Sequence, residues 1–443
     1  MSPFARVLQI GVAYLNIQLT LCAVLPTPSG PYKINSLALA FTDASRNDTG
    51  AADFPNLTVP RSLMTTIYYP ITSLADNKTY ISCSAPPYSN DTTAFLPPVT
   101  ASFLSKRLEL PGLVNLRSSI PNDVGHPEST RARADPQQNI GRAEFPLLLF
   151  SPAFATSRLL YASLLSDLAS HGYVVVSLDH PYDTDIVEFP SVSSAPPNPG
   201  GEVIYSPFLN VSDPELLIDY STTAQEIRAE DISFIVSILL DPGSYSGSSP
   251  PLPLGLPNKQ QKPIILLGHS LGGASALLAL SKDARLAAAI NLDGFIFGPA
   301  SNSYLPDFGT DKPFLLMSSR DGGGNTESWD VFWDLSRFNS TEDAAGISEK
   351  SRWVEWATAQ HYDFSDLPLV LATLGVNDFP SQEIRDTYPL ERNVTGFRKR
   401  EIVRESVLAF LAGVVDGVDG GVVDGESDRF PELNVVKRGD TAS

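Results

Sequence analysis

Short apolar runs alternate with longer amphipathic segments through the middle of the chain. The runs are rich in Leu, Ile and Val, as expected for strands buried on both faces, whereas the longer segments carry apolar residues at helical spacing. Strands that alternate with helices predict an α/β fold, with a mostly parallel open sheet and helices on both faces. The predicted strands are Pro146–Phe150, Tyr173–Leu178, Ile264–Leu267, Ala287–Leu292, Pro313–Ser318 and Arg352–Ala357, and the predicted helices are Ser157–Ser170 and Asp219–Leu240.

The rest of the chain departs from this rhythm in three ways. Ile34–Phe41 is close enough to alternation for a strand, Leu63–Pro70 is a second predicted strand, and we expect both to be antiparallel strands that open the sheet. Irregular insertions rich in Pro, Ser, Asn or Gly are expected near the C-terminal ends of the strands, at residues 71–143, 181–215 and 241–258. Residues 413–443 are rich in Gly, Asp and Val, so we expect a disordered tail after a domain that spans 24–412.

Residues 1–23 have the profile of a secretory signal peptide. Arg6 precedes an apolar stretch that runs to Val24, and the proline-rich stretch Leu25–Pro28 follows it. A buried first helix fits these prolines less well, so we expect cleavage after Ala23. No later segment is long and apolar enough to span a bilayer, and we therefore expect a secreted, soluble chain without a transmembrane segment.

Potential glycosylation sites agree with secretion. Seven Asn-x-Ser/Thr sequons are present, more than the few that chance would place in such a chain. After Ala23 the only cysteine is Cys83, so we expect the fold to depend on its core and not on disulfide bonds. The candidate acceptors are Asn47, Asn56, Asn77, Asn90, Asn210, Asn339 and Asn393.

Composition and charge exclude several classes of partner. The formal net charge of −19 gives a negative field that repels nucleic acid and anionic membrane surfaces. No basic run and no Cys/His cluster with metal-ligand spacing is present, so we expect neither a metal nor another cofactor. A small-molecule or lipid substrate fits this balance better.

The motif around which the chain is organised directly follows the predicted strand Ile264–Leu267. It reads Gly268-His269-Ser270-Leu271-Gly272, and a helix-favouring segment rich in small residues comes next. A serine on a tight turn between strand and helix stands clear of the sheet, and the flanking glycines let strand and helix pass without a Cβ clash. This context predicts a nucleophile elbow at Ser270 rather than an ordinary glycine-rich turn.

A serine hydroxyl needs a base within hydrogen-bond reach. His361 is the only histidine downstream of Ser270, and it lies just past the last predicted strand. His180 also follows a strand but precedes the nucleophile, which makes it a candidate for lining the pocket. We expect no catalytic role for the other histidines, which are His126, His171 and His269.

The acid that orients the base has two candidates. Asp293 follows the strand next to the elbow strand, and Asp321 follows the strand after that, a position that many α/β-hydrolases use. Asp321 precedes three glycines, as in an ordinary turn. Asp293 precedes an apolar stretch that begins with Phe295, a second candidate for lining the pocket. The residues alone do not choose between the two aspartates.

Three segments together resemble the secreted platelet-activating-factor acetylhydrolase family of α/β-hydrolases. They are the elbow Gly268–Gly273, Leu292-Asp293-Gly294-Phe295, and His361-x-x-Phe364-Ser365-Asp366, within a similarity over roughly 145–370. The resemblance implies that Asp293 is the acid. It also implies a metal-independent serine esterase, acting through an acyl-enzyme on phospholipids with short or oxidised acyl chains.

The oxyanion hole is expected to combine the N–H of Leu271 with one from the loop after Pro146–Phe150. The resembling family has F-S-H-G-L-G where this chain reads Phe150-Ser151-Pro152-Ala153-Phe154-Ala155, which makes Phe154 the matching donor. This departure leaves a general carboxylesterase and a cutinase-like polyester hydrolase as alternatives.

A different class of function is a catalytically silent hydrolase fold that binds a partner through its proline-rich insertions. Loss of one triad residue would favour this hypothesis. Ser270, Asp293 and His361 are all present, which favours an enzyme.

Overall fold

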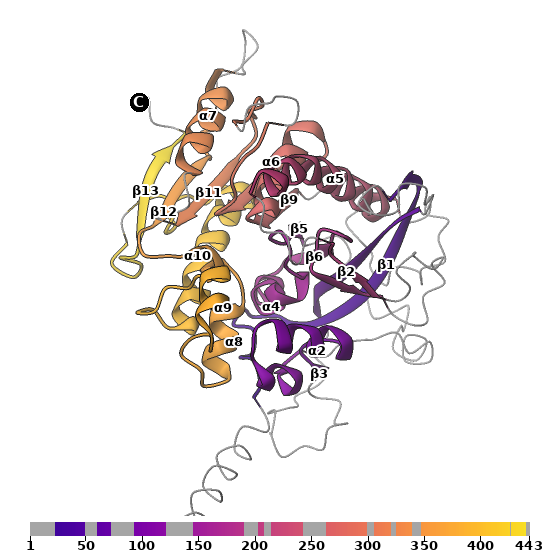
Figure 1. The fold of residues 1–443 in the computed structure, drawn as a ribbon. Helices are drawn as coiled ribbons and strands as arrows, with labels where there is room; N and C mark the ends of the chain where they lie inside the picture. The colour runs from indigo at the N-terminus through magenta and orange to yellow at the C-terminus, as the bar shows by residue number, and fades with distance from the viewer. Residues whose placement is uncertain are drawn as a thin grey trace, which may run out of the picture.

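The computed structural model of the protein has a single large sheet with helices on both sides (Figure 1). It describes residues 23–48, 60–71, 93–120, 145–189, 203–207, 214–241, 263–298, 305–319, 325–338, 347–425 and 427–439. The predicted signal peptide therefore lies outside the described residues, apart from Ala23. The sequons at Asn56, Asn77, Asn90, Asn210 and Asn339 also lie outside them.

Among the residues described, the sheet has nine strands, and the six at its centre run parallel. Two antiparallel strands open it and one antiparallel strand closes it, in the order β1-β2-β6-β5-β9-β10-β11-β12-β13. The mostly parallel sheet expected from the apolar runs is confirmed. The strands are β1 (Lys33–Asn47), β2 (Pro60–Ile71), β5 (Leu147–Ser151), β6 (Val174–Asp179), β9 (Ile264–His269), β10 (Ala288–Leu292), β11 (Phe314–Ser319), β12 (Arg352–Trp356) and β13 (Leu433–Arg438).

Each face of the sheet has its own hydrophobic core, because successive side chains of a strand point to opposite faces. In β5, Leu148 and Phe150 enter one core, whereas Leu147 and Leu149 enter the other. Helices α4 (Ala162–Ser170), α8 (Leu367–Thr373) and α10 (Gly396–Val415) contribute to the first core, and α5 (Pro214–Leu240), α6 (Leu271–Lys282) and α7 (Asn325–Phe338) to the second. Helices on both faces are thus confirmed.

The insertion expected to be irregular over 71–143 contains ordered structure in its described part. Residues 93–120 form a short pair of strands, β3 (Thr93–Ala94) and β4 (Arg117–Ser118), around α2 (Pro98–Arg107) and the 3-10 turn η1 (Pro111–Asn115). The expectation is wrong there because Leu104, Leu108 and Leu113 are buried in the first core.

The second insertion also contributes regular structure, and it is tied to the first. Residues 181–215 include the antiparallel pair β7 (Ile186–Glu188) and β8 (Val203–Tyr205). The carboxylate of Glu188 accepts the backbone N–H of Thr100 at 2.9 Å, near the start of α2. Of the third insertion, 241–258, only Asp241 is described.

The expectation of a disordered tail over 413–443 is wrong for the described residues. Helix α10 continues to Val415, and β13 pairs antiparallel with β12 at the edge of the sheet. The cause is burial of a few apolar side chains among the glycines and aspartates, since Phe430 and Leu433 enter the first core and Val435 packs against it. Figure 1 shows β13 as the yellow edge strand beside β12.

Two observations bear on the expectations about membranes and glycans. No described helix has the length and hydropathy required to cross a membrane. Of the sequons, Asn47 ends β1 and Asn393 precedes α10, and both are exposed.

Candidate active site

Ser270 occupies the sharp turn between β9 and α6. Its backbone has φ 56° and ψ −128°, a conformation that a residue with a Cβ rarely adopts. The turn is held by the Ser270 N–H, which donates to the carbonyl of Leu292 at 2.8 Å. The Ser270 carbonyl accepts the N–H groups of Gly273 and Ala274. The nucleophile elbow predicted from sequence thus has the expected strand, turn and helix.

Two of the elbow glycines are required by close backbone approach. A Cβ on Gly268 would lie 2.2 Å from the backbone of Gly272, and one on Gly272 would lie 2.1 Å from the carbonyl oxygen of Ser151. Neither contact can be relieved by moving a flexible side chain, because both partners are backbone atoms. The glycines therefore let α6 start directly against the loop that follows β5.

His361 and Asp293 complete a hydrogen-bonded chain with the serine. The Nδ1 of His361 is 2.7 Å from Oδ2 of Asp293, and its Nε2 is 2.9 Å from Oγ of Ser270. A carboxylate only accepts hydrogen bonds, so Nδ1 carries the proton and Nε2 is left to accept one from the serine. The structure thus brings together the three residues that the sequence singled out, in the tautomer a general base needs.

The environment of Asp293 keeps its carboxyl ionised. Its Oδ1 accepts the backbone N–H of Ser319 at 2.8 Å and the Ser319 hydroxyl at 2.9 Å. Burial works to raise the pKa of Asp293, but the hydrogen bonds from His361 and Ser319 hold this pKa below its usual value. Sequence reasoning missed Ser319, since a serine at the end of a strand carries no signal of its own.

The three side chains differ in their access to solvent. The Asp293 side chain is fully buried, whereas that of His361 is 33% exposed and Ser270 is partly exposed. A substrate can therefore reach the serine and the imidazole but not the carboxylate. Asp321, the alternative acid, lies outside the described residues.

The two expected oxyanion-hole donors lie on elements that meet at the elbow. Leu271 is the first residue of α6, so its N–H has no acceptor within the helix. Phe154 lies in the loop after β5, whose start packs against Gly272, and its ring lies 5.7 Å from that of Tyr220. The neighbouring Ala155 has a positive φ of 50°, so this loop too has an unusual backbone.

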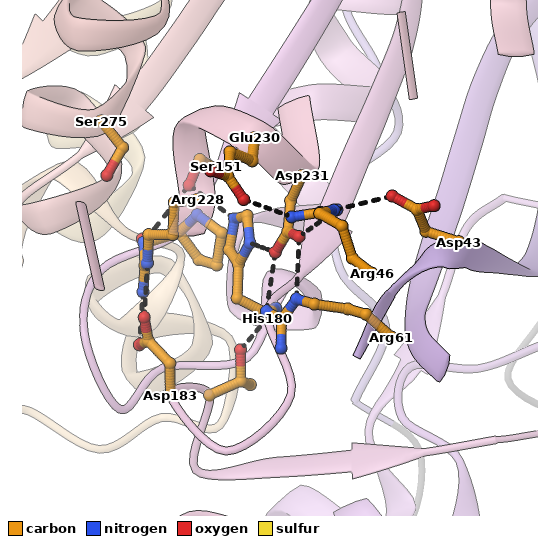
Figure 2. A network of polar contacts seen from close by, with 12 residues as sticks. Asp43, Arg46, Arg61, Ser151, His180, Asp183, Arg228, Glu230, Asp231 and Ser275 are labelled. Atoms are coloured by element: carbon orange, nitrogen blue, oxygen red, sulfur yellow. Dashed lines mark hydrogen bonds and ion pairs between the residues drawn. The ribbon is translucent and has the colours of Figure 1, made fainter. Parts of the chain in front are cut away.

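His180 does not line a pocket, contrary to the expectation from sequence. Its side chain is fully buried, with Nδ1 2.8 Å from Oδ2 of Asp231 and Nε2 2.9 Å from Oγ of Ser151 (Figure 2). Ser151 and Asp231 are also buried. Because His180 directly follows β6, we expected its ring to face the pocket at the C-terminal ends of the strands. The ring instead points into the protein interior.

Phe295, the other candidate for lining a pocket, is half-buried close to Asp293. Its ring lies 4.7 Å from that of Phe297, and Ile296 between them is fully buried. Gly294 is held by Asn291, which exchanges two hydrogen bonds with its backbone at 2.8 and 2.9 Å. The segment that follows Asp293 is therefore anchored, with an aromatic side chain partly open to solvent.

His269, the middle residue of the elbow motif, joins the two loops of the site. Its Nε2 lies 2.8 Å from the carbonyl oxygen of His361, so this nitrogen is the protonated one. Its Nδ1 then accepts the hydroxyl of Tyr161 at 2.7 Å, and the Tyr161 oxygen accepts the N–H of Ala153 at 3.3 Å. Burial and the neighbouring His361 lower the pKa of His269 to about 3, which keeps it neutral.

Replacing Tyr161 with phenylalanine is expected to destabilise the fold by about 1–3 kcal/mol, because it leaves two buried polar groups without a partner. Those groups are Nδ1 of His269 and the N–H of Ala153. Urea unfolding measures the loss. Tyr68→Phe is the matched control, because Tyr68 is also buried in the first core but its hydroxyl makes no hydrogen bond to the described residues. Equal losses in both variants would contradict this account of Tyr161.

Within the described residues, no group of three or more His, Cys, Asp or Glu side chains is arranged to hold a metal ion. The side chains at the elbow supply a hydroxyl beside a base, with a buried acid behind the base.

A family model described as the alpha/beta hydrolase family matches residues 147–407. The chain belongs to this family, and the fold class predicted from sequence is confirmed. Its curated relatives carry more particular names. It is 29% identical over 415 residues to a probable 1-alkyl-2-acetylglycerophosphocholine esterase of Arthroderma benhamiae, which covers 93% of each chain.

Other relatives agree with this class. The chain is 27% identical over 168 residues to the platelet-activating factor acetylhydrolase of Bos taurus, which covers 36% of this chain and 37% of that protein. A ferulic acid esterase from Streptomyces cinnamoneus has a similar solved structure, with a TM-score of 0.65 and 25% identity over 94% of this chain and 99% of that one. The chain is an enzyme that hydrolyses carboxylic esters, as predicted.

Proposed function

We propose that the protein is a serine esterase in which Ser270 is the nucleophile, His361 the general base and Asp293 the acid that orients it. The observation that carries the proposal is the pair of hydrogen bonds from His361, at 2.9 Å to the Ser270 hydroxyl and 2.7 Å to the Asp293 carboxylate. The tautomer set by Asp293 leaves Nε2 of His361 ready to take the serine proton.

In the first half of the reaction, Oγ of Ser270 attacks the ester carbonyl carbon while its proton passes to Nε2 of His361. The carbonyl oxygen becomes an oxyanion, and the N–H groups of Leu271 and Phe154 are the proposed donors to it. When the tetrahedral intermediate collapses, the ester C–O bond breaks. The leaving alcohol takes the proton from His361, and the acyl group remains on Ser270.

In the second half, a water molecule gives its proton to Nε2 of His361 and attacks the acyl-enzyme. Collapse of the second tetrahedral intermediate releases the carboxylic acid and returns the proton to Ser270. Asp293 stays ionised throughout and stabilises the imidazolium, in agreement with the lowered pKa of its carboxyl.

We propose a phospholipid with a short or oxidised acyl chain as the substrate. Support comes from the names of the Arthroderma benhamiae and Bos taurus relatives. The segment Leu292-Asp293-Gly294-Phe295, which resembles the platelet-activating-factor acetylhydrolase family, adds to it. The similarity to a ferulic acid esterase favours the second candidate, a general carboxylesterase. Cutinase-like polyester hydrolysis is a third.

A series of glycerophosphocholines with sn-2 acyl chains of increasing length tests this substrate class. The proposal predicts that kcat/KM falls steeply beyond short acyl groups, and that removing the phosphocholine group lowers it further. A preference for simple feruloyl or p-nitrophenyl esters over any phospholipid would support the general carboxylesterase. No turnover of any ester would support a binding protein instead.

We further propose that the protein is secreted and glycosylated. The N-terminal pattern supports secretion, and the exposed Asn47 and Asn393 support glycosylation. Expression in a eukaryotic secretory host, followed by N-terminal sequencing and glycosidase treatment, tests both. The expected result is a mature chain that starts at Val24 and loses mass when its glycans are removed.

A further inference from the structure

A cluster of buried charged and polar side chains contacts the segment Ser151–Ala155 at the end of β5, which we call the oxyanion loop. Figure 2 shows the members of the cluster. The six residues of this buried cluster are at most 3% exposed. Even when buried charges are paired, the cost of removing them from water offsets much of their mutual attraction. Such a cluster therefore contributes little net stability, and we looked for another role. Its members are Arg61, Ser151, His180, Asp183, Arg228 and Asp231.

Arg228, from the middle of α5, is the member that contacts the oxyanion loop most extensively. Its Nη1 donates to the carbonyl oxygen of Pro152 and, at 3.2 Å, to Oγ of Ser151. Its Nη2 lies 3.4 Å from the carbonyl oxygen of Ala153. One guanidinium therefore reaches three consecutive residues of the loop.

Asp183 fixes Arg228 and holds the far end of the same loop. Its two carboxylate oxygens accept Nε and Nη2 of Arg228, each at 2.6 Å. Its backbone carbonyl accepts the N–H of Ala155 at 3.1 Å. The residues on both sides of Phe154 are thus held by the Arg228–Asp183 pair.

His180 and Asp231 hold the start of the loop at Ser151. His180 donates from Nδ1 to Asp231, so its Nε2 accepts the hydroxyl of Ser151 at 2.9 Å. Ser151, His180 and Asp231 repeat the order of a catalytic triad. They are buried, however, and Arg228 reaches the Ser151 oxygen that would have to attack. This second Ser-His-Asp group is therefore a structural support.

We propose that Arg228 is a positioning residue for the oxyanion hole, acting through the backbone of Pro152 and Ala153 on the direction of the Phe154 N–H. The inference rests on the proposed function, in which Phe154 is one of the two donors. An oxyanion donor works only when it is aimed at the position that the oxyanion will occupy. The planar fork of arginine can pair with Asp183 and still donate to the loop, whereas a lysine ammonium has only three donors at one point.

The experiment compares Arg228→Lys with the matched control Arg61→Lys. Arg61 is a second buried arginine of the cluster, but its hydrogen bonds go to Asp231 and Asp48 and not to the oxyanion loop. For each variant we would measure kcat and KM with a short-chain ester. We would also measure the affinity for a trifluoromethyl ketone, which forms a tetrahedral oxyanion on the serine. The thermal midpoint of unfolding would be measured for each variant too.

The expected result for Arg228→Lys is a fall in kcat of about 10- to 100-fold with KM nearly unchanged, as for a misdirected oxyanion donor. Affinity for the ketone should fall in parallel with kcat/KM. Arg61→Lys should lower the thermal midpoint but keep kcat and ketone affinity. If Arg228→Lys does not fold, Asp183→Asn should show the same pattern to a smaller extent, because it weakens the hydrogen bonds that fix the Arg228 guanidinium.

Two results would overturn the inference while leaving the proposed function intact. One is an active wild type whose Arg228→Lys or Asp183→Asn variant keeps the full kcat and ketone affinity. The other is an equal loss of kcat in Arg61→Lys, which would make the effect a general consequence of disturbing the cluster. A wild-type protein that hydrolyses no ester would overturn the proposed function first, and this inference with it.

Discussion

Replacing Ser270 with alanine is expected to lower kcat/KM for a short-chain p-nitrophenyl ester on the order of 10⁴- to 10⁶-fold. The reason is that the hydroxyl at 2.9 Å from Nε2 of His361 is the proposed attacking group, and alanine has no hydroxyl. The fold should be unaffected, because the substitution removes only a hydroxyl group that is not part of either hydrophobic core. Far-UV circular dichroism and thermal unfolding check this.

Ser281→Ala is the matched control for this variant. Ser281 lies on the same helix, α6, and is exposed at its end. Its hydroxyl donates only to the carbonyl of Leu278, so the variant should keep wild-type kcat/KM. An active Ser270→Ala variant would contradict the assignment of the nucleophile.

The second large effect is expected at Asp293. The Asp293→Asn variant should lose about 10⁴-fold in kcat, as when the acid of a Ser-His-Asp triad is made neutral. An asparagine amide can donate to Nδ1 of His361 and so favour the tautomer with the proton on Nε2. That tautomer cannot accept the proton of Ser270.

Asp321→Asn serves as the comparison, since Asp321 is the other acid that the sequence allowed. We expect this variant to retain wild-type kcat. The reason is that the Asp293 carboxylate already accepts hydrogen bonds from His361 and Ser319. These hydrogen bonds lower the pKa of the Asp293 carboxyl. A dead Asp321→Asn variant beside an active Asp293→Asn variant would assign the acid to the commoner position and remove the main support for a phospholipid substrate.

The central part of the fold could be predicted because its signals are local. The run Ile264–Leu267 predicts a buried strand, and the glycines on either side of Ser270 predict a tight turn at one place in the chain. The elements that were missed depend on a few buried side chains in otherwise polar sequence. Leu104 in α2 and Leu433 in β13 are examples, since neither lies in a periodic apolar pattern that single-sequence reasoning detects.

The candidate site was predictable to the same extent. The sequence named Ser270, His361 and Asp293, although choosing between Asp293 and Asp321 required the resemblance to a known family. The polar support beneath the site could not be found in this way. Arg228 lies 45 residues from Asp183 and 76 from Pro152 along the chain, so its contacts are set by tertiary packing and leave no motif. His180 shows the same limit, because a position after a strand does not tell which way its ring points.

The most direct test of the account is the site of covalent labelling by a fluorophosphonate, determined by intact mass and by mass spectrometry of peptides. We expect one adduct per active chain, on Ser270. It should be absent from Ser270→Ala and form much more slowly in Asp293→Asn. An adduct on Ser151 would contradict the assignment of Ser270 as the nucleophile. Loss of ester hydrolysis after treatment of the wild type with no label on Ser270 would contradict it as well.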